Sequence, residues 1–481
     1  MPIRAFILPL LVGPLLVALL LAGAGSCKAA GRPGEEGREA EARELLEKAE
    51  EGAKRGQYRK AWNTFKLLSK EYADTPAGQR AASRAGESGF LCASDLLRHG
   101  PSRNRVDVVV MGEGFTLDQQ DDFDTLSKVV LRNFPRSEVF EEYFAYHNFI
   151  RANLHSAESG VDGHNRTYDT ALDARLSGGI QGQVAVSRQR VHAMLAELPE
   201  HDQLAIAFVK NGNLGTGGGG VASVGGRSPK TMIHEWGHAF ASLMDEYSSN
   251  TGHRGQVENG PNVARTEDPD QVPWKHWLER RVSGVGIYQG AAGRPQGAWK
   301  PTNNCIMDVG VDFCPICREA IVLEIYRLVD PIEGCRPAPH DASSDPITID
   351  MTRSVRELEP VEFQVEILTP ASHGLLVCWW VLPEEQAPPF SELDLDRSSK
   401  DRRVRGPLRP IEERPRQRSH RTGQRSVSFE VDPRDFDPGR YLVVCRVTDT
   451  ARPRGAKVPW VLSDPAGVLQ AERSWRLHLQ Q

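Results

Sequence analysis

The sequence has little net charge for its length. Its 481 residues contain 59 Lys and Arg against 64 Asp and Glu, which gives a formal charge of −5 at pH 7. So small a charge argues against a nucleic-acid-binding protein, because such proteins need an excess of basic residues. By ordinary domain lengths, the chain has room for about three domains.

The sequence also lacks two complete binding motifs. The glycine-rich stretch 215–220 lacks the Gly-Lys-Ser/Thr ending of a phosphate-binding loop, so we expect no nucleotide there. The chain has one Cys-x-x-Cys pair, Cys314 and Cys317, and no second pair that would complete a structural zinc site. We therefore expect Cys305 to form a disulfide with Cys314 or Cys317, with a redox-active pair as the alternative.

Residues 1–26 predict a secretory signal. A basic residue, Arg4, precedes an apolar run at 6–21 that prolines and glycine interrupt, which disfavours a transmembrane helix. Cys27 follows Ala-Gly-Ser, as in bacterial lipoproteins, so we expect lipidation of Cys27 and a membrane anchor. The expected location is the outer membrane or cell surface; with ordinary cleavage it is the periplasm or the medium.

The next two segments predict a tether and a helical hairpin. Residues 27–37 are expected to be the tether, and residues 38–100 the hairpin, because apolar side chains recur at helical spacing on both sides of a break at 56–58. The pair resembles one tetratricopeptide repeat, but no second copy follows, so we expect a spacer or a docking hairpin.

Residues 104–335 alternate between strand and helix patterns. A buried strand is predicted at 106–111, a helix at 116–134, and further strands at 144–156 and 203–210. This alternation predicts an α/β domain.

Within this domain, residues 234–238 read His-Glu-Trp-Gly-His, the HExxH pattern of zinc peptidases. In a helix, His234 and His238 lie one turn apart on the same face, so both imidazoles can bind one metal ion. Glu235 can then take a proton from a metal-activated water whose pKa falls towards roughly 7. Ser228 or Thr231 is expected to cap this helix.

A third metal ligand requires the helix to end soon after His238. On a continuous helix, Asp245 would lie about 10.5 Å further along the axis, whereas zinc–oxygen bonds are about 2.0–2.2 Å. We therefore predict a break at 241–243 and favour Asp245 over Glu246 as the ligand, with a surface role for both acids as the alternative. Tyr247 either assists the oxyanion or, as we favour, anchors this loop.

Residues 305–307 read Cys-Ile-Met. Metzincins place a methionine turn beneath the metal after the HExxH helix, and we expect Met307 to occupy that position. The expected disulfide from Cys305 would tether this turn.

Residues 341–481 predict an immunoglobulin-like β-sandwich, because short runs at 347–351, 361–367, 427–431 and 441–447 follow strand patterns. A Cys378–Cys445 bridge is expected within it. Residues 400–425 hold ten Lys and Arg against three acids, a local balance of 10 − 3 = +7. We expect a solvated loop there, with contact to anionic lipid or polysaccharide as the alternative.

Together these motifs resemble the IgA-peptidase family of bacterial zinc metalloendopeptidases, which are metzincin-like zincins. The resemblance covers about residues 104–332 and rests on the ordered segments 109–115, 155–160, 169–171, 234–238, 245–247, 274–277, 305–307 and 313–317. Trp236 and Ala241 depart from the phenylalanine and glycine expected at those positions.

The resemblance implies a secreted or surface-anchored endopeptidase with one catalytic Zn²⁺ and a protein or peptide substrate. It does not imply immunoglobulin A as that substrate, because a family rarely fixes the target of a protease. Two alternatives stay open: a non-catalytic surface-binding protein on a zincin scaffold, and a zinc amidase acting on cell-wall peptides. The intact His-Glu-His set speaks against the first.

Overall fold

The computed structural model describes residues 35–163, 165–176, 182–248, 258–340, 343–386 and 418–481. The predicted signal, Cys27 and most of the basic segment 400–425 lie outside the described residues. Within the described part of the chain, no helix is both long enough and apolar enough to span a membrane.

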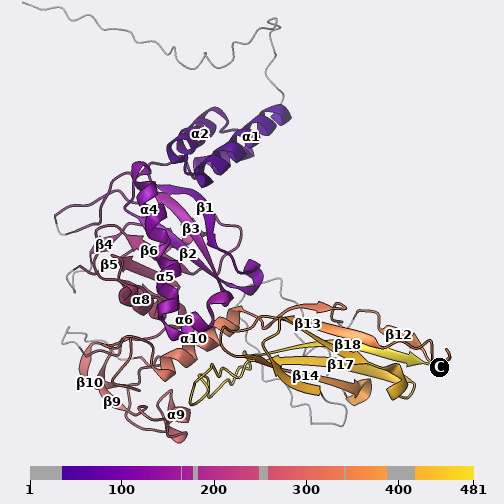
Figure 1. The fold of residues 1–481 in the computed structure, drawn as a ribbon. Coiled ribbons are helices and arrows are strands. Elements are labelled where there is room, and N and C mark those ends of the chain that lie inside the picture. The colour runs from indigo at the N-terminus through magenta and orange to yellow at the C-terminus, as the bar shows by residue number, and fades with distance from the viewer. Residues whose placement is uncertain (1–34, 164, 177–181, 249–257, 341–342, 387–417) are drawn as a thin grey trace, which may run out of the picture.

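The described chain begins with helices α1 (Glu35–Lys54), α2 (Tyr58–Glu71) and α3 (Pro76–Ala82). Their apolar faces share one core with strand β1 (Gly89–Leu97), so the helices lie at one end of the central sheet (Figure 1). Helix α3 was not predicted. Its start is encoded locally, because the Thr75 side chain accepts a hydrogen bond from the backbone N–H of Gly78 and Pro76 fits the first helical turn.

The described residues form a central six-stranded sheet in the order β1-β3-β2-β6-β8-β7. Strands β3, β2, β6 and β8 run parallel, and β1 and β7 are antiparallel edge strands. The bounds are β2 (Val106–Glu113), β3 (His147–His155), β6 (Ala205–Val209), β7 (Thr216–Gly218) and β8 (Val221–Gly225). Every residue of β2 is buried, as expected for a parallel strand covered on both faces. The predicted α/β architecture is therefore confirmed at this level.

Helices cover both faces of the sheet. Side chains of α4, α5, α6, α8 and α10 share one apolar core with the sheet, and α7 packs on the opposite face. The bounds are α4 (Gln120–Ser127), α5 (Val129–Asn133), α6 (Glu138–Glu142), α7 (Arg188–Leu195), α8 (Pro229–Ala241), α9 (Lys275–Glu279) and α10 (Pro315–Leu328).

The prediction of one helix over 116–134 is wrong in its continuity. Thr116 and Gln119 form a capping box, but α4 and α5 then follow as separate short helices. The backbone at Lys128 has ψ −12°, which is too flat to continue the α-helical hydrogen-bond ladder. Small hairpins pair β4 (Arg175–Leu176) with β5 (Val184–Ala185) and β9 (Tyr288–Ala291) with β10 (Arg294–Lys300).

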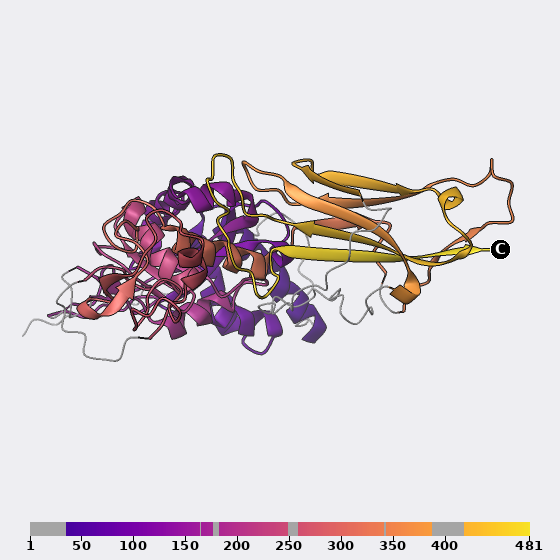
Figure 2. The same cartoon turned by 90° about the horizontal axis from the view of Figure 1, so that it is seen from below.

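The C-terminal part has two sheets that share an apolar core (Figure 2). One sheet has the order β11-β13-β16, and the other the order β12-β18-β17-β14-β15. The bounds are β11 (Ile332–Arg336), β12 (Ile347–Asp350), β13 (Val361–Ile367), β14 (Leu375–Pro383), β15 (Arg418–Thr422), β16 (Ser426–Val431), β17 (Gly439–Thr448) and β18 (Gln470–Gln480).

The expected Cys378–Cys445 bridge is wrong, because neither residue is in a disulfide. Strands β14 and β17 pair so that Cys445 lies opposite Trp379 rather than Cys378. Adjacent residues of a strand face opposite sides of a sheet. Cys445 accordingly lies in the core between the sheets, whereas Cys378 packs with Trp380 on the outer face.

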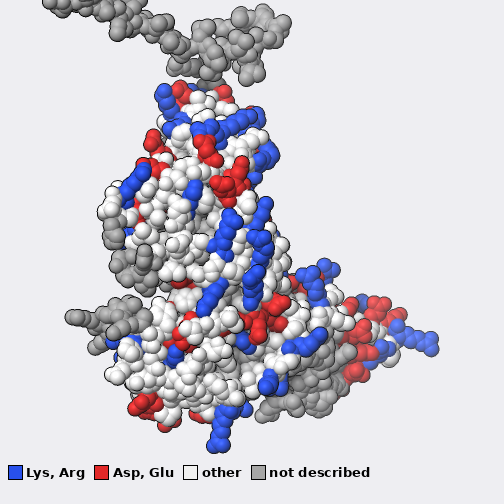
Figure 3. Space-filling model, turned by 60° about the vertical axis from the view of Figure 1, so that its left-hand side comes forward, with Lys and Arg blue, Asp and Glu red and all other residues white. Residues whose placement is uncertain are grey.

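The two parts of the chain are in direct contact. The segment between β17 and β18 extends to α10, and its residues Ala451, Trp460 and Val461 join the core of the first part (Figures 1 and 2). On the face of the molecule seen in Figure 3, acidic and basic side chains both occur along its length, in keeping with the small net charge.

Candidate metal centre

Helix α8 carries the HExxH residues and lies against β7 and β8. Of the two expected caps, Ser228 is the one used: its Oγ accepts a hydrogen bond from Thr231 N at 3.3 Å. Trp236 and Phe240 are buried and stack with their rings 5.5 Å apart, which fixes the inner face of the helix against the core. The imidazoles of His234 and His238 then project from the other side, where both are partly exposed.

The predicted break at 241–243 is confirmed, because α8 ends at Ala241. Ser242 has φ 53°, in the left-handed region, and Leu243 N donates to Gly237 O at 3.3 Å. This conformation reverses the chain at the end of the helix. As a result, Asp245 Oδ1 lies 3.1 Å from the Nε2 atoms of both His234 and His238.

The two imidazole rings are held in one tautomer. His234 Nδ1 lies 2.9 Å from Ile306 O, and His238 Nδ1 lies 2.6 Å from Leu243 O. A carbonyl oxygen can only accept a hydrogen bond, so each Nδ1 carries a proton and each Nε2 is the ring atom left for a metal ion.

The two Nε2 atoms, of His234 and His238, lie 3.2 Å apart and converge with the carboxylate of Asp245. Three electron-rich atoms at this spacing repel one another unless a proton or a metal ion lies between them. Atoms bound about 2.0–2.2 Å from one ion at tetrahedral angles lie about 3.3–3.6 Å apart. The observed separations of 3.1–3.2 Å are close to that range, so this donor set fits a divalent metal ion.

The family of this region follows from comparison with known proteins. Residues 95–283 match the family model described as IgA Peptidase M64. Residues 95–283 belong to this peptidase family. The matched segment includes α8 and the chain reversal, and it ends before Cys305. Membership of the M64 family supports a peptidase that uses a metal ion.

Comparison with curated proteins gives no match. Among solved structures, an endo-beta-1,4-mannanase from Thermotoga petrophila aligns at 11% identity with a TM-score of 0.14. The alignment covers 62% of this chain and 50% of the mannanase chain, so this chain spans about half the length of the mannanase.

In the M64 domain, Glu235 lies between His234 and His238 in sequence and is 8% exposed. Burial raises the pKa of Glu235 above its ordinary value. For Asp245, burial acts in the same direction, but hydrogen bonds from His234 and His238 outweigh it and hold the pKa of Asp245 below its usual range. Asp245 is therefore held ionised, whereas Glu235 has a higher proton affinity than an exposed glutamate.

The glycine-rich stretch of the M64 domain is the edge strand β7, which passes very close to α8. A Cβ on Gly217 would lie 2.2 Å from Glu235 O and 2.7 Å from His238 Cβ. Only glycine allows this approach. Gly217 therefore allows β7 to pack closely against α8.

Tyr247 and Met307 pack against the residues of the candidate metal centre. The Tyr247 ring stacks on His234 with centroids 6.4 Å apart, and its hydroxyl hydrogen-bonds Asp245. Met307 is fully buried, and its Sδ would lie 3.1 Å from a Cβ on Gly237 in α8. Met307 thus lies next to α8, as expected for a methionine turn. Its backbone carbonyl accepts a hydrogen bond from Glu246 N at 2.7 Å.

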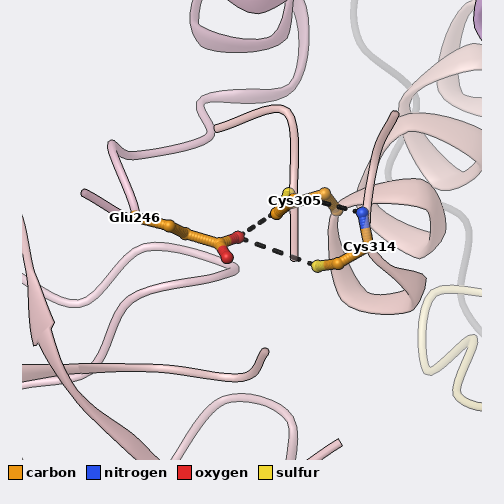
Figure 4. Close-up of side chains that lie close together, drawn as sticks. Glu246, Cys305 and Cys314 are labelled. Carbon is orange, nitrogen blue, oxygen red and sulfur yellow. Dashed lines mark hydrogen bonds between the residues drawn. The ribbon is translucent and has the colours of Figure 1, made fainter. Parts of the chain in front are cut away.

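Glu246 does not face the imidazoles. Its carboxylate is buried beside Cys305 and Cys314 (Figure 4) and beside Cys317. The expected disulfide from Cys305 is wrong, because all three cysteines are free thiols and Cys305 Sγ lies 3.7 Å from Cys317 Sγ. A disulfide bond is about 2.05 Å long. The grouping of Glu246 with these thiols was missed, because the sequence offered no second Cys-x-x-Cys pair as a signal.

Proposed function

We propose that the protein is a zinc-dependent endopeptidase that hydrolyses peptide bonds with water. The observation that carries this proposal is the convergence of His234 Nε2, His238 Nε2 and Asp245 Oδ1 within 3.1–3.2 Å of one another. Two imidazoles and a carboxylate are a donor set typical of catalytic zinc, which keeps a further position open for water or substrate. The predicted signal and Cys27 support export and a lipid anchor.

The residues of the chain divide the proposed reaction between them. When bound, zinc would polarise the peptide carbonyl and make water more acidic. Glu235 accepts the proton of the attacking water and passes it to the leaving amine. The raised pKa of Glu235 suits this double role, because the carboxylate must hold the proton before releasing it. Tyr247 acts on the position of Asp245 through its hydrogen bond.

The surroundings of the site support an extended peptide as substrate. β7 is an edge strand, and an edge strand can pair with an extended chain through its backbone groups. A cavity of about 430 Å³ lies along β7, lined in part by Thr216, Gly218, Arg175 and Arg188. This arrangement favours an endopeptidase over an amidase that acts on short cell-wall peptides.

The test is Glu235→Gln in the full-length protein, with Glu279→Gln as control. Glu279 is exposed on α9. We expect Glu235→Gln to retain its metal content and lose roughly 10²–10⁴-fold in casein cleavage, the usual contribution of general acid–base catalysis. Unchanged activity in this variant would refute the assignment. Metal binding without cleavage of any peptide by the wild type would favour the surface-binding alternative, and cleavage of cell-wall peptides alone would favour the amidase.

A further inference from the structure

Glu246 and the three cysteines form a compact buried cluster. One ligand atom from each residue lies within 4.8 Å of the others, and every member is buried. Figure 4 shows Glu246 pointing toward Cys305 and Cys314. The residues come from three segments: the reversal after α8, the turn before Met307, and the start of α10, where Cys314 is the N-cap and Cys317 lies in the first turn.

The distances in this cluster match a tetrahedral metal site. With zinc–sulfur bonds of about 2.3 Å and zinc–oxygen bonds of about 2.0–2.2 Å, tetrahedral angles place two sulfurs about 3.8 Å apart and sulfur about 3.6 Å from oxygen. Cys305 Sγ lies 3.7 Å from Cys317 Sγ, and Cys314 Sγ lies 3.7 Å from Glu246 Oε1. Cys317 Sγ lies closer to Glu246 Oε1, at 3.1 Å.

Among the described residues, no cationic side chain contacts the Glu246 carboxylate. Its side chain is fully buried. Oε1 accepts from Asn262 Nδ2 at 2.9 Å and from the thiols of Cys314 and Cys317, whereas Oε2 has no hydrogen-bond partner among the described residues. Lys300 lies next to it, but Lys300 Nζ donates to the backbone oxygen of Glu246 at 2.8 Å and to Asp308 Oδ2 at 2.5 Å. A buried carboxylate is costly unless a cation or a full set of donors accompanies it.

Burial raises the pKa of Cys305 and Cys317, but two features of the fold act in the opposite direction. The N-terminus of the 14-residue helix α10 directs its positive dipole end at Cys314 and Cys317. The backbone N–H of Cys314 also donates to Cys305 Sγ at 3.3 Å. Both features stabilise sulfur in its charged, metal-binding form.

We propose that Glu246, Cys305, Cys314 and Cys317 bind a second zinc ion with a structural role. Three thiolates and one carboxylate give a closed four-coordinate set, in contrast to the open set at the histidines. The sequence led us to expect a single zinc ion. The second site was not expected, because its fourth ligand is a carboxylate rather than a cysteine.

The second ion would hold the segments that position the first site. Glu246 follows Asp245 directly, and Cys305 precedes Ile306, whose carbonyl fixes the tautomer of His234. One ion bound to both segments and to α10 would therefore lock the chain reversal against the methionine turn.

The first test uses zinc analysis and zinc X-ray absorption on the wild-type chain and on His234→Ala/His238→Ala. We expect two zinc ions per wild-type chain, with sulfur neighbours at about 2.3 Å. The double variant should keep one zinc, surrounded by three sulfurs. Zinc without sulfur neighbours in the wild type would overturn the second site. A wild-type chain that binds both zinc ions but cleaves no peptide would overturn the proposed function instead.

The second test compares Cys317→Ser with the control Cys92→Ser. Cys92 is also buried, but it packs beneath α1 and α2, away from the cluster. We expect Cys317→Ser to lose one zinc ion and its sulfur signal, and Cys92→Ser to keep both ions. If Cys317→Ser fails to fold, cobalt substitution of the wild type decides, because thiolate ligands give charge-transfer absorption that the histidine site cannot. Absence of that absorption would overturn the proposal.

Discussion

A buried ion network joins the C-terminal sheets to the M64 domain, and its centre is His373. The His373 Nδ1 atom lies 2.7 Å from Glu142 Oε1, and Nε2 lies 2.7 Å from Asp449 Oδ1. Tyr143 and Tyr326 donate to the second oxygen of Asp449, each at 2.7 Å. Both ring nitrogens face carboxylates, so the imidazole is held as a cation.

The magnitude follows from the pKa of His373. Burial disfavours the cation, but the hydrogen bonds to Asp449 and Glu142 outweigh it and raise the pKa of His373 from 6.5 to about 9. At about 1.4 kcal/mol for each pH unit, this rise corresponds to roughly 3 kcal/mol of stability. Because the folded-state pKa is the higher one, this contribution is complete below pH 6.5 and is lost as the pH rises through about 9.

We therefore predict that His373→Gln lowers the free energy of unfolding by about 3 kcal/mol at pH 6.5, and that the difference from wild type shrinks towards pH 10. Urea unfolding across this pH range measures both quantities. The exposed His192 in α7 provides a control, and His192→Gln should match wild type at every pH. A His373→Gln difference that stays constant from pH 6.5 to 10 would refute the reasoning.

Two further predictions concern the metal-binding region. Asp245→Asn should weaken zinc binding at the histidine site by more than the roughly 10–100-fold typical of an outer-shell partner, measured by competition with a chelator; unchanged affinity would exclude Asp245 as a ligand. Gly217→Ala should cost about 1–3 kcal/mol through overpacking against Glu235 O and His238, and should lower kcat/KM for casein. Gly423→Ala, where a Cβ meets no atom within 4 Å, should do neither, and equal behaviour of the two variants would contradict the close approach of β7.

The features that could be predicted from the sequence depend on local chemistry. The spacing of His234 and His238 defines one helix face, and the length of a metal–oxygen bond required a chain reversal before Asp245. The choice between Asp245 and Glu246 could not be derived with certainty, because it depends on the left-handed backbone of Ser242. That conformation is uncommon for serine and leaves no clear trace in the sequence.

The errors concern contacts between segments that are distant in sequence. The cysteines were paired with one another because their nearest sequence neighbours were cysteines, yet Glu246 from the reversal after α8 completes their group. The Cys378–Cys445 bridge failed because the register of β14 and β17 sets which face each cysteine occupies. Register and the packing of separate segments arise from the whole fold and are not encoded in a short motif.

The adjacent carboxylates of Asp245 and Glu246 face opposite sides of the same stretch of backbone. A deletion of one residue between Ser242 and Asp245 would bring Glu246 to the place of Asp245, and an insertion would bring Asp245 to the place of Glu246. Both groups of ligands would then be mismatched at once. Most surface loops tolerate changes in length. In this short connection, by contrast, both groups of ligands constrain the number of residues.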